Sequence, residues 1–496
     1  MVEQTVQVAV SPARSLGALD RNVFGGFVEH LGRCIDGGLF ELGSPLSDER
    51  GFRRDVLDLL RQMGISVLRW PGGNFASTYR WVDGIGPANV RPIRPNLAWG
   101  GAEPNTFGTD EFLSYCAELG AAPYICLNMG TGTLREALEW VEYCNSMSRS
   151  YWAGQRQRNG HDEPYGVTYW GLGNEMYGDW QVGQLSAAEY VATAVSWARA
   201  LRRAGPGVKL ISCGLNGWSD WDRQVIDGLA GLVDLHSLHL YTGADDYWTN
   251  VLTPHQAERA ITCTSALLAR AAYEQHLDRV PGIAYDEWNV WYRTDDGFLE
   301  ERYSFADALA VATYLNIFVR NCSMVRMANL AQLVNAIAPV VTTPQGAYPQ
   351  PTYYPFLLHA GSALDEAVDA AVKGPVVAAP SEALGRWQHR LNYLGPFSLV
   401  DAAATTDTER SRISVTLVNR QVEGVTDVVV RLRDFAFVGN PSVKTLTGET
   451  GSGARVLPDI EAVTLEEGTG LSKGADGFIT LPPKSFAVIE ARITRE

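Results

Sequence analysis

The sequence predicts an α/β protein in which a (β/α)8 TIM barrel is followed by a C-terminal antiparallel β-sandwich of the jelly-roll type. Between about residues 20 and 360, short β-type apolar runs alternate with amphipathic helical stretches, the pattern that builds a parallel sheet. Eight such runs occur, which is the number that closes a barrel. After about residue 360, Val-, Thr- and Ile-rich segments separated by Gly, Asp and Pro indicate a sandwich.

The eight predicted barrel strands are bounded by turn residues and rich in β-branched and aromatic side chains. Helical spacing of apolar residues fills the intervals between them, most clearly over residues 185–204 and 256–276. The predicted strands are 23–29, 66–70, 122–128, 167–171, 209–213, 233–240, 282–286 and 324–332.

Three helix starts fit the capping-box pattern, in which a Ser or Thr is followed three residues later by Glu or Gln. These pairs are Thr133 with Glu136, Ser186 with Glu189, and Thr253 with Gln256, the last with a proline between them.

An apolar β-type run at residues 6–10 precedes the barrel and has no helix of its own. We expect it to pair into the C-terminal sandwich and join the two domains. The predicted domains are therefore 19–360 for the barrel, and 1–18 together with 361–496 for the sandwich.

Composition excludes several classes of protein. The 496 residues carry a formal net charge of -15 without a basic stripe, which argues against nucleic-acid and phosphate ligands. We expect no membrane insertion or export, and hence a cytoplasmic location, because no 18-residue apolar run occurs and the N-terminus lacks a signal pattern. The seven cysteines include no CxxC and predict reduced thiols rather than disulfides or a zinc cluster.

Polar residues follow or end every predicted barrel strand. Ligand-binding side chains of such barrels lie at the C-terminal ends of the strands. Buried polar groups cost about 1 to 3 kcal/mol each when unpaired, so this ring predicts a hydroxyl-rich ligand. Its members are Glu29, His30, Arg69, Asn74, Asn128, Asn174, Glu175, Asn216, His239, Tyr241, Glu287, Gln332 and Asn335.

Two glutamates of this ring predict the chemistry. Glu175 and Glu287 follow predicted strands four and seven, which lie nearly opposite each other in an eight-stranded ring. Two facing carboxyl groups are what the hydrolysis of a glycosidic bond requires. Asp286 is a weaker candidate, since alternation along a strand directs it to the other side from Glu287.

Tryptophans crowd the same loops, and we expect Trp99 and Trp180 to stack on sugar rings because their surroundings are polar. His30 and His239 are predicted to form hydrogen bonds or to pack, since no His/Asp cluster with ligand spacing accompanies them. Gly171 and Gly173 lack the third glycine of a dinucleotide fingerprint. We therefore expect neither a metal nor a cofactor.

Five separated segments give the chain a family resemblance. Because these segments occur in the same order along the barrel, the chain resembles the α-L-arabinofuranosidases of glycoside hydrolase family 51. That family belongs to a clan of retaining barrel glycosidases. The segments are EHLGRCI at 29–35, LRWPGGNF at 68–75, YWGLGNEM at 169–176, DEWNVW at 286–291 and AQLVNAIAP at 331–339.

The resemblance implies roles for individual residues. It implies that Glu175 is the general acid/base, for which we expect a raised pKa, and that Glu287 is the nucleophile, with the two carboxyl groups about 5 to 5.5 Å apart. It also implies that Arg69 and Tyr241 orient Glu287. Furanose hydroxyls would be held by Glu29, Asn74, Asn174, Tyr241 and Gln332, and residues 96–105 and 176–180 would line the leaving-group side.

The function expected from the resemblance is that of an exo-acting, cofactor-free α-L-arabinofuranosidase. Its substrates would be arabinan and arabinoxylan oligosaccharides, and its assembly a hexamer. Two alternatives stay open: β-glucanase or β-xylosidase activity on the same scaffold, and a non-catalytic sugar-binding protein. A closed sugar pocket favours the exo-enzyme, whereas an open cleft favours an endo-enzyme.

Overall fold

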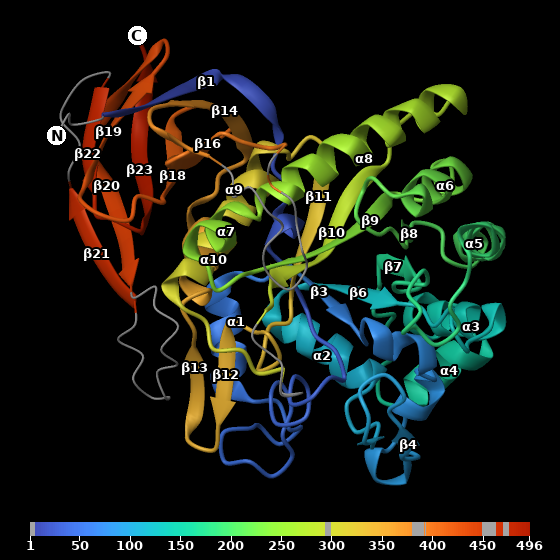
Figure 1. Ribbon diagram of the computed structural model, residues 1–496. Helices are drawn as coiled ribbons and strands as arrows, with labels where there is room; N and C mark the ends of the chain where they lie inside the picture. Colours follow the sequence, from blue (N-terminus) through green and yellow to red (C-terminus); the bar gives the residue numbers. More distant parts are fainter. Residues whose placement is uncertain (1–4, 293–298, 379–390, 392, 449–462, 470–475) are drawn as a thin grey trace.

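Eight parallel strands close into a barrel in the computed structural model, which describes residues 5–292, 299–378, 391, 393–448, 463–469 and 476–496 (Figure 1). All eight predicted strands are confirmed. Around the ring they follow the order β10, β11, β2, β3, β6, β7, β8, β9. Their bounds are β2 Gly25–Phe27, β3 Val67–Trp70, β6 Ala122–Cys126, β7 Tyr169–Leu172, β8 Lys209–Ser212, β9 Leu235–Thr242, β10 Gly282–Val290 and β11 Val325–Ala331.

Two strands run two or more residues further than the sequence predicts. β9 continues to Thr242 and β10 to Val290, so Glu287 lies within its strand and not after it. Residues 287–290, in which polar and apolar side chains alternate, pair with β9 as far as Thr242, which extends the ladder. This extension places the nucleophile candidate on rigid backbone.

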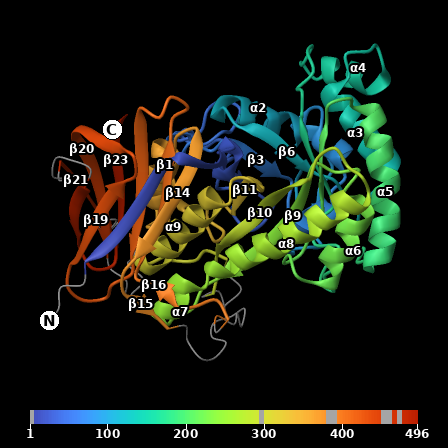
Figure 2. The same ribbon diagram turned by 90° about the horizontal axis from the view of Figure 1, so that it is seen from above.

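Helices surround the barrel on its outer face (Figures 1 and 2). Capping boxes begin α3 at Thr133 and α5 at Ser186, as predicted. The third predicted box is wrong: Thr253 donates its hydroxyl to the Thr249 carbonyl and continues the preceding turn, so α8 begins at His255. The helices are α1 Arg54–Met63, α2 Thr109–Leu119, α3 Leu134–Asn145, α4 Tyr151–Arg158, α5 Ala187–Ala204, α6 Asp220–Leu229, α7 Tyr247–Leu252, α8 His255–Glu274, α9 Phe305–Arg320 and α10 Tyr353–Ser362.

A nine-stranded sheet forms the C-terminal part, around its own core of Val, Ile, Leu, Ala and Phe side chains. The predicted N-terminal run is part of β1, which lies between β14 and β19, as Figure 2 shows. Its pairing with β19 is parallel, an exception to the predicted antiparallel sandwich. The order is β21 Val463–Thr469, β20 Phe435–Gly448, β23 Ser485–Arg495, β18 Arg412–Asn419, β17 Val400–Thr406, β14 Glu366–Lys373, β1 Val6–Ala18, β19 Thr426–Leu432 and β22 Asp476–Leu481.

Helix α9 joins the two parts. Nearly all of its residues are buried because the barrel covers one side and the sheet the other, as its apolar sequence requires. At its end Arg320 pairs with Asp401 of β17 at 3.0 Å. Within the residues that the structure describes, no helix is both long and apolar enough to cross a membrane.

Short hairpins complete the fold: β4 Arg94–Pro95 with β5 Ala102–Glu103, β12 Val340–Thr343 with β13 Gly346–Pro349, and β15 Val376–Val377 with β16 Phe397–Ser398. The first of these carries Trp99 in its turn.

Candidate active site

Glu175 and Glu287 meet at the C-terminal end of the barrel, as the strand count predicts. One carboxylate oxygen of each, with one ring nitrogen of His239, lie within 4.8 Å of one another. Glu175 follows β7, and Glu287 is next to His239 in the register of β10 and β9. Closure of the barrel therefore brings together two acids that are 112 positions apart in the sequence.

Alternate residues of β9 point into the site, because side chains two apart share one face of a strand. Ser237 donates a hydrogen bond to Asp286, and the Tyr241 hydroxyl donates to Glu287 Oε2 at 2.9 Å. Between them, His239 contacts Glu175. One strand thus supplies three polar contacts, two to β10 and one to the loop after β7.

Asp286 corrects one prediction, because it faces the same site as Glu287. The register of β10 shifts between Ala284 and Glu287 against β9, and between Tyr285 and Trp288 against β11. Such a bulge interrupts alternation and turns two successive side chains to one side. The Asp286 carboxylate accepts from the Tyr124 hydroxyl at 2.7 Å and lies 3.7 Å from Arg69 Nε.

Arg69 of β3 is the buried cation at the centre of the site. Its Nη1 donates to Glu287 Oε1 at 2.6 Å, and its Nη2 donates to Asn174 Oδ1 at 2.7 Å. Burial alone would lower the pKa of Arg69, but Asp286 and Glu287 raise it well above its usual range. The guanidinium therefore stays charged and fixes Glu287 and Asn174 together.

Burial also perturbs Asp286. It would raise the pKa of the Asp286 carboxyl, but the charge of Arg69 and the contacts with His239 and Ser237 outweigh it and lower the pKa to about 2. Asp286 is consequently a permanent anion at neutral pH.

Glu29 contacts two of the other predicted binding residues, Trp99 and Gln332. Its Oε1 accepts from the Phe75 amide at 2.9 Å and from Trp99 Nε1 at 3.0 Å, and its Oε2 accepts from Gln332 Nε2 at 3.1 Å. Burial raises the pKa of Glu29 to about 7, although the two N–H donors to Oε1 act in the opposite direction.

Asn74 joins the same rim through Asn174, whose Nδ2 donates to Asn74 Oδ1 at 3.3 Å. Six of the predicted residues, namely Arg69, Asn74, Asn174, Glu175, Tyr241 and Glu287, thus form one connected set with His239.

Glu175 departs from the prediction in its acidity. We expect a raised pKa for a general acid, and burial does act in that direction, but contacts with His239 and Trp180 lower the pKa of Glu175 instead. Trp180 is 59% exposed and donates its Nε1–H to Glu175 Oε2 at 3.0 Å. The backbone of Glu175 has φ 44°, a strained region for a non-glycine residue, which fixes the direction of its side chain.

His239 is the source of that effect. Burial would lower the pKa of His239, but Glu287, Asp286 and Glu175 raise it to about 10. The ring is therefore a cation at neutral pH.

Three predicted members of the polar ring serve loops instead of the site. Asn128 accepts from the amides of residues 130–132, and Asn216 accepts from those of Trp218 and Ser219. Asn335 donates to the Arg33 carbonyl. Such hydrogen bonds between side chains and backbone are common in turns. They satisfy these backbone groups and the asparagine side chains without a ligand.

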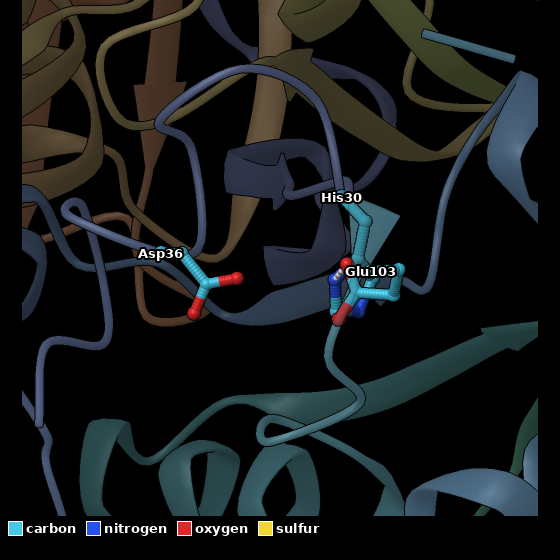
Figure 3. Close-up of side chains that lie close together, drawn as sticks. All are labelled: His30, Asp36 and Glu103. Carbon is cyan, nitrogen blue, oxygen red and sulfur yellow. Dashed lines mark ion pairs between the residues drawn. The ribbon is translucent and has the colours of Figure 1, made fainter. Parts of the chain in front are cut away.

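His30 belongs to a second group of candidate metal-binding side chains, with Asp36 and Glu103 (Figure 3). Trp70 Nε1 donates to His30 Nε2 at 3.1 Å, so the neutral ring carries its proton on Nδ1, which lies 2.8 Å from Glu103. A metal on Nδ1 would require that proton to leave. The contacts fit the predicted hydrogen-bonding role, which ties the hairpin that carries Trp99 to the barrel.

Reasoning from the sequence set Asp286 aside as a weaker candidate and missed two residues of the site, Ser237 and Tyr124. Ser237 stands two residues before His239, so the alternation of β9 could have found it. Tyr124 and Asp286 gave no such signal, because their contact depends on the bulge in β10.

Family models and known relatives similar to this chain are described as α-L-arabinofuranosidases. Two family models match, the alpha-L-arabinofuranosidase 1 domain over residues 59–259 and the alpha-L-arabinofuranosidase C-terminal domain over residues 286–485. The probable alpha-L-arabinofuranosidase C of Aspergillus fumigatus is 41% identical over 494 residues, 96% of this chain and 96% of the relative. An exo-alpha-(1->6)-L-arabinofuranosidase of Bifidobacterium longum is 34% identical and covers 95% of this chain and 94% of its own length.

A solved structure agrees with these matches. The thermostable GH51 alpha-L-arabinofuranosidase from Thermotoga petrophila RKU-1 has a TM-score of 0.90 and 37% identity to this chain, over 98% of this chain and 100% of that chain.

Proposed function

The chain belongs to the α-L-arabinofuranosidases of glycoside hydrolase family 51, and from this premise we propose that it is an exo-acting enzyme that removes terminal arabinofuranosyl residues. Its substrates are arabinan and arabinoxylan oligosaccharides. The observation that carries this proposal is the meeting of Glu175 and Glu287 at the end of the barrel, beside a ring of hydrogen-bonding side chains.

The reaction is a double displacement that retains configuration. Glu287 attacks the anomeric carbon, while Glu175 protonates the leaving oxygen and later deprotonates water. Support comes from the closeness of the two acids: oxygens within 4.8 Å leave no room for the water that an inverting enzyme places across about 6.5 to 9.5 Å. Arg69 and Tyr241 hold the two oxygens of Glu287 and stabilise its negative charge.

The sugar sits on the polar rim. Glu29, Asn74, Asn174, Tyr241 and Gln332 bind the hydroxyls of the furanose. Trp99 and Trp180, which are hydrogen-bonded to Glu29 and Glu175, form walls at the entrance. Indoles hydrogen-bonded to two of the acids favour the binding of one terminal sugar over that of a continuous chain.

A panel of 4-nitrophenyl glycosides tests the substrate class. We expect hydrolysis of the α-L-arabinofuranoside to exceed that of the β-D-xyloside and the β-D-glucoside. No preference for the furanoside would contradict the proposal.

Two variants test the roles of the acids. Glu287→Ala should abolish turnover on every substrate. Glu175→Ala should retain activity on aryl glycosides with good leaving groups and regain turnover with azide, because a good leaving group needs no proton. Equal loss of activity on all leaving groups in the second variant would remove Glu175 from the acid/base role.

We also propose that the protein is cytoplasmic and that it forms a hexamer, the assembly that the family resemblance implies. Sedimentation equilibrium would test the assembly, and a single species at the monomer mass would contradict it.

A further inference from the structure

His239 lies among three carboxylates, two on the neighbouring strand β10 and one in the loop after β7. Its Nδ1 is 2.9 Å from Glu175 Oε1 and 3.5 Å from Glu287 Oε2, and its Nε2 is 3.4 Å from Asp286 Oδ1. Both ring nitrogens thus face acceptors, and only the doubly protonated ring has a proton for each. The distances fit an imidazolium that donates to a carboxylate from each of its two nitrogens.

This arrangement leaves the acid/base candidate without the proton it needs. With His239 charged, Glu175 is ionised, and Trp180 stabilises the same state from the other side. Yet a leaving sugar oxygen has to be protonated. The nearest available proton is the one on His239 Nδ1, hydrogen-bonded to Glu175.

Other charged and titratable groups around the ring are accounted for. Arg69 bonds Glu287 and lies near Asp286, so it offsets their charge but does not touch the imidazole. Tyr177 and Tyr241, whose pKa values are raised well above the usual range, stay neutral. The thiol of Cys213 also stays neutral, because burial raises its pKa.

We propose that His239 stores the proton of the catalytic cycle and passes it through Glu175, so that the charge on Glu287 controls when the proton is delivered. His239 is in this sense a positioning residue for the proton, and Glu175 is the group that touches the substrate. The inference rests on the proposed double displacement and deepens it.

In the first step, Glu287 forms a bond to the anomeric carbon and loses its charge. The attraction of the Glu287 charge for the proton on His239 disappears with that charge. The proton then moves from Nδ1 to Glu175 and on to the leaving oxygen as the glycosidic bond breaks. Glu175 is left ionised and His239 neutral, and the total charge of the site is unchanged.

In the second step, Glu175 takes a proton from water while the hydroxide oxygen bonds to the anomeric carbon. The ester bond to Glu287 breaks and restores its negative charge. That charge draws the proton from Glu175 onto His239, which regenerates the starting state. No oxidant or additional acid is consumed.

His239→Asn tests the proposal because asparagine keeps a donor at this position but cannot hold a second proton. In this variant Glu175 has to carry the proton itself, and it loses that proton at a lower pH than the wild-type pair does. Compared with wild type, hydrolysis of an alkyl α-L-arabinofuranoside should be close to normal at pH 5 and about a hundredfold slower at pH 8. On the 2,4-dinitrophenyl arabinofuranoside, whose leaving group needs no acid, the ratio of wild-type to variant rates should be the same at pH 5 and pH 8.

His236→Asn is the matched control. His236 is buried on the same strand and also pairs with a carboxylate, Asp222 at 3.1 Å, but it lies outside the site. Glu29, with its pKa of about 7, titrates in all three proteins and so cannot produce a difference between them. A loss of activity in His239→Asn that is the same at pH 5 and pH 8 and on both substrates would mean a structural role and overturn the proposal.

A proton-release measurement separates this inference from the proposed function. A 2-fluoro-substituted dinitrophenyl arabinofuranoside accumulates the glycosyl-enzyme while its leaving group departs as an anion. At pH 8 the wild type should release about one proton per site into a weakly buffered indicator solution, and His239→Asn should release none. Formation of the intermediate without proton release would refute proton storage and leave the double displacement intact; no intermediate at all would refute the double displacement.

Discussion

Replacing Asp286 with asparagine removes one buried negative charge from between two cations. The wild-type carboxylate lies 3.7 Å from Arg69 and 3.4 Å from His239. Its pKa is lowered from 3.8 to about 2, a difference of about two units, which corresponds to roughly 2.5 kcal/mol of stability at neutral pH. Leaving the partners of a buried charge uncompensated adds to this, so we expect a total destabilisation of about 3 to 5 kcal/mol.

The pH dependence follows from the direction of the pKa shift. A carboxyl group with a depressed folded pKa stabilises the protein above its unfolded pKa and loses that contribution as the pH falls through the folded pKa. The charge-linked part of the difference between wild type and Asp286→Asn should therefore be complete at pH 6 and fall to roughly half by pH 3.

Urea unfolding followed by tryptophan fluorescence at both pH values measures the effect. Asp58→Asn is a suitable control, since Asp58 is exposed and its surface pair with Arg61 should be worth less than about 1 kcal/mol. If Asp286→Asn unfolds at the wild-type urea concentration, or if its deficit is the same at pH 6 and pH 3, the electrostatic account of this site is wrong.

Two further changes probe the same network. Glu29→Gln should be more stable than wild type at pH 8, by up to roughly 3 kcal/mol, and equally stable at pH 4. The reason is that the pKa of Glu29 is raised to about 7 in the folded protein, so wild type loses stability as the pH rises through 7. Urea unfolding midpoints at pH 4 and pH 8 would measure the difference. Arg69→Lys should lower kcat/KM about a hundredfold on good and poor leaving groups alike, because one ammonium cannot hold Glu287 and Asn174 together. Arg53→Lys, at a buried arginine that pairs with Glu41 and Asp55, should leave kcat/KM unchanged; a leaving-group dependence in Arg69→Lys would contradict its role.

The sequence by itself determined the barrel and its two principal acids. Strand periodicity and strand-end polarity are local properties, so the run ending in Asn174 and Glu175 could be placed without knowledge of its neighbours. Eight runs then fix a closed ring, and a closed ring puts Glu175 opposite Glu287. The pairing of residues 6–10 with the C-terminal sheet was also predictable, since an apolar strand leaves its backbone groups unpaired unless it joins a sheet.

Only the tertiary structure decided which charges meet. Asp286 faces the site because β10 bulges, and a bulge depends on the register with β9 and β11 together. The acidity of Glu175 depends on a 2.9 Å contact with His239, which comes from a strand 64 residues away. Coulomb energies depend on distances in three dimensions, and desolvation depends on burial in the folded chain. No local pattern in the sequence could therefore state that His239 would lower the pKa of Glu175.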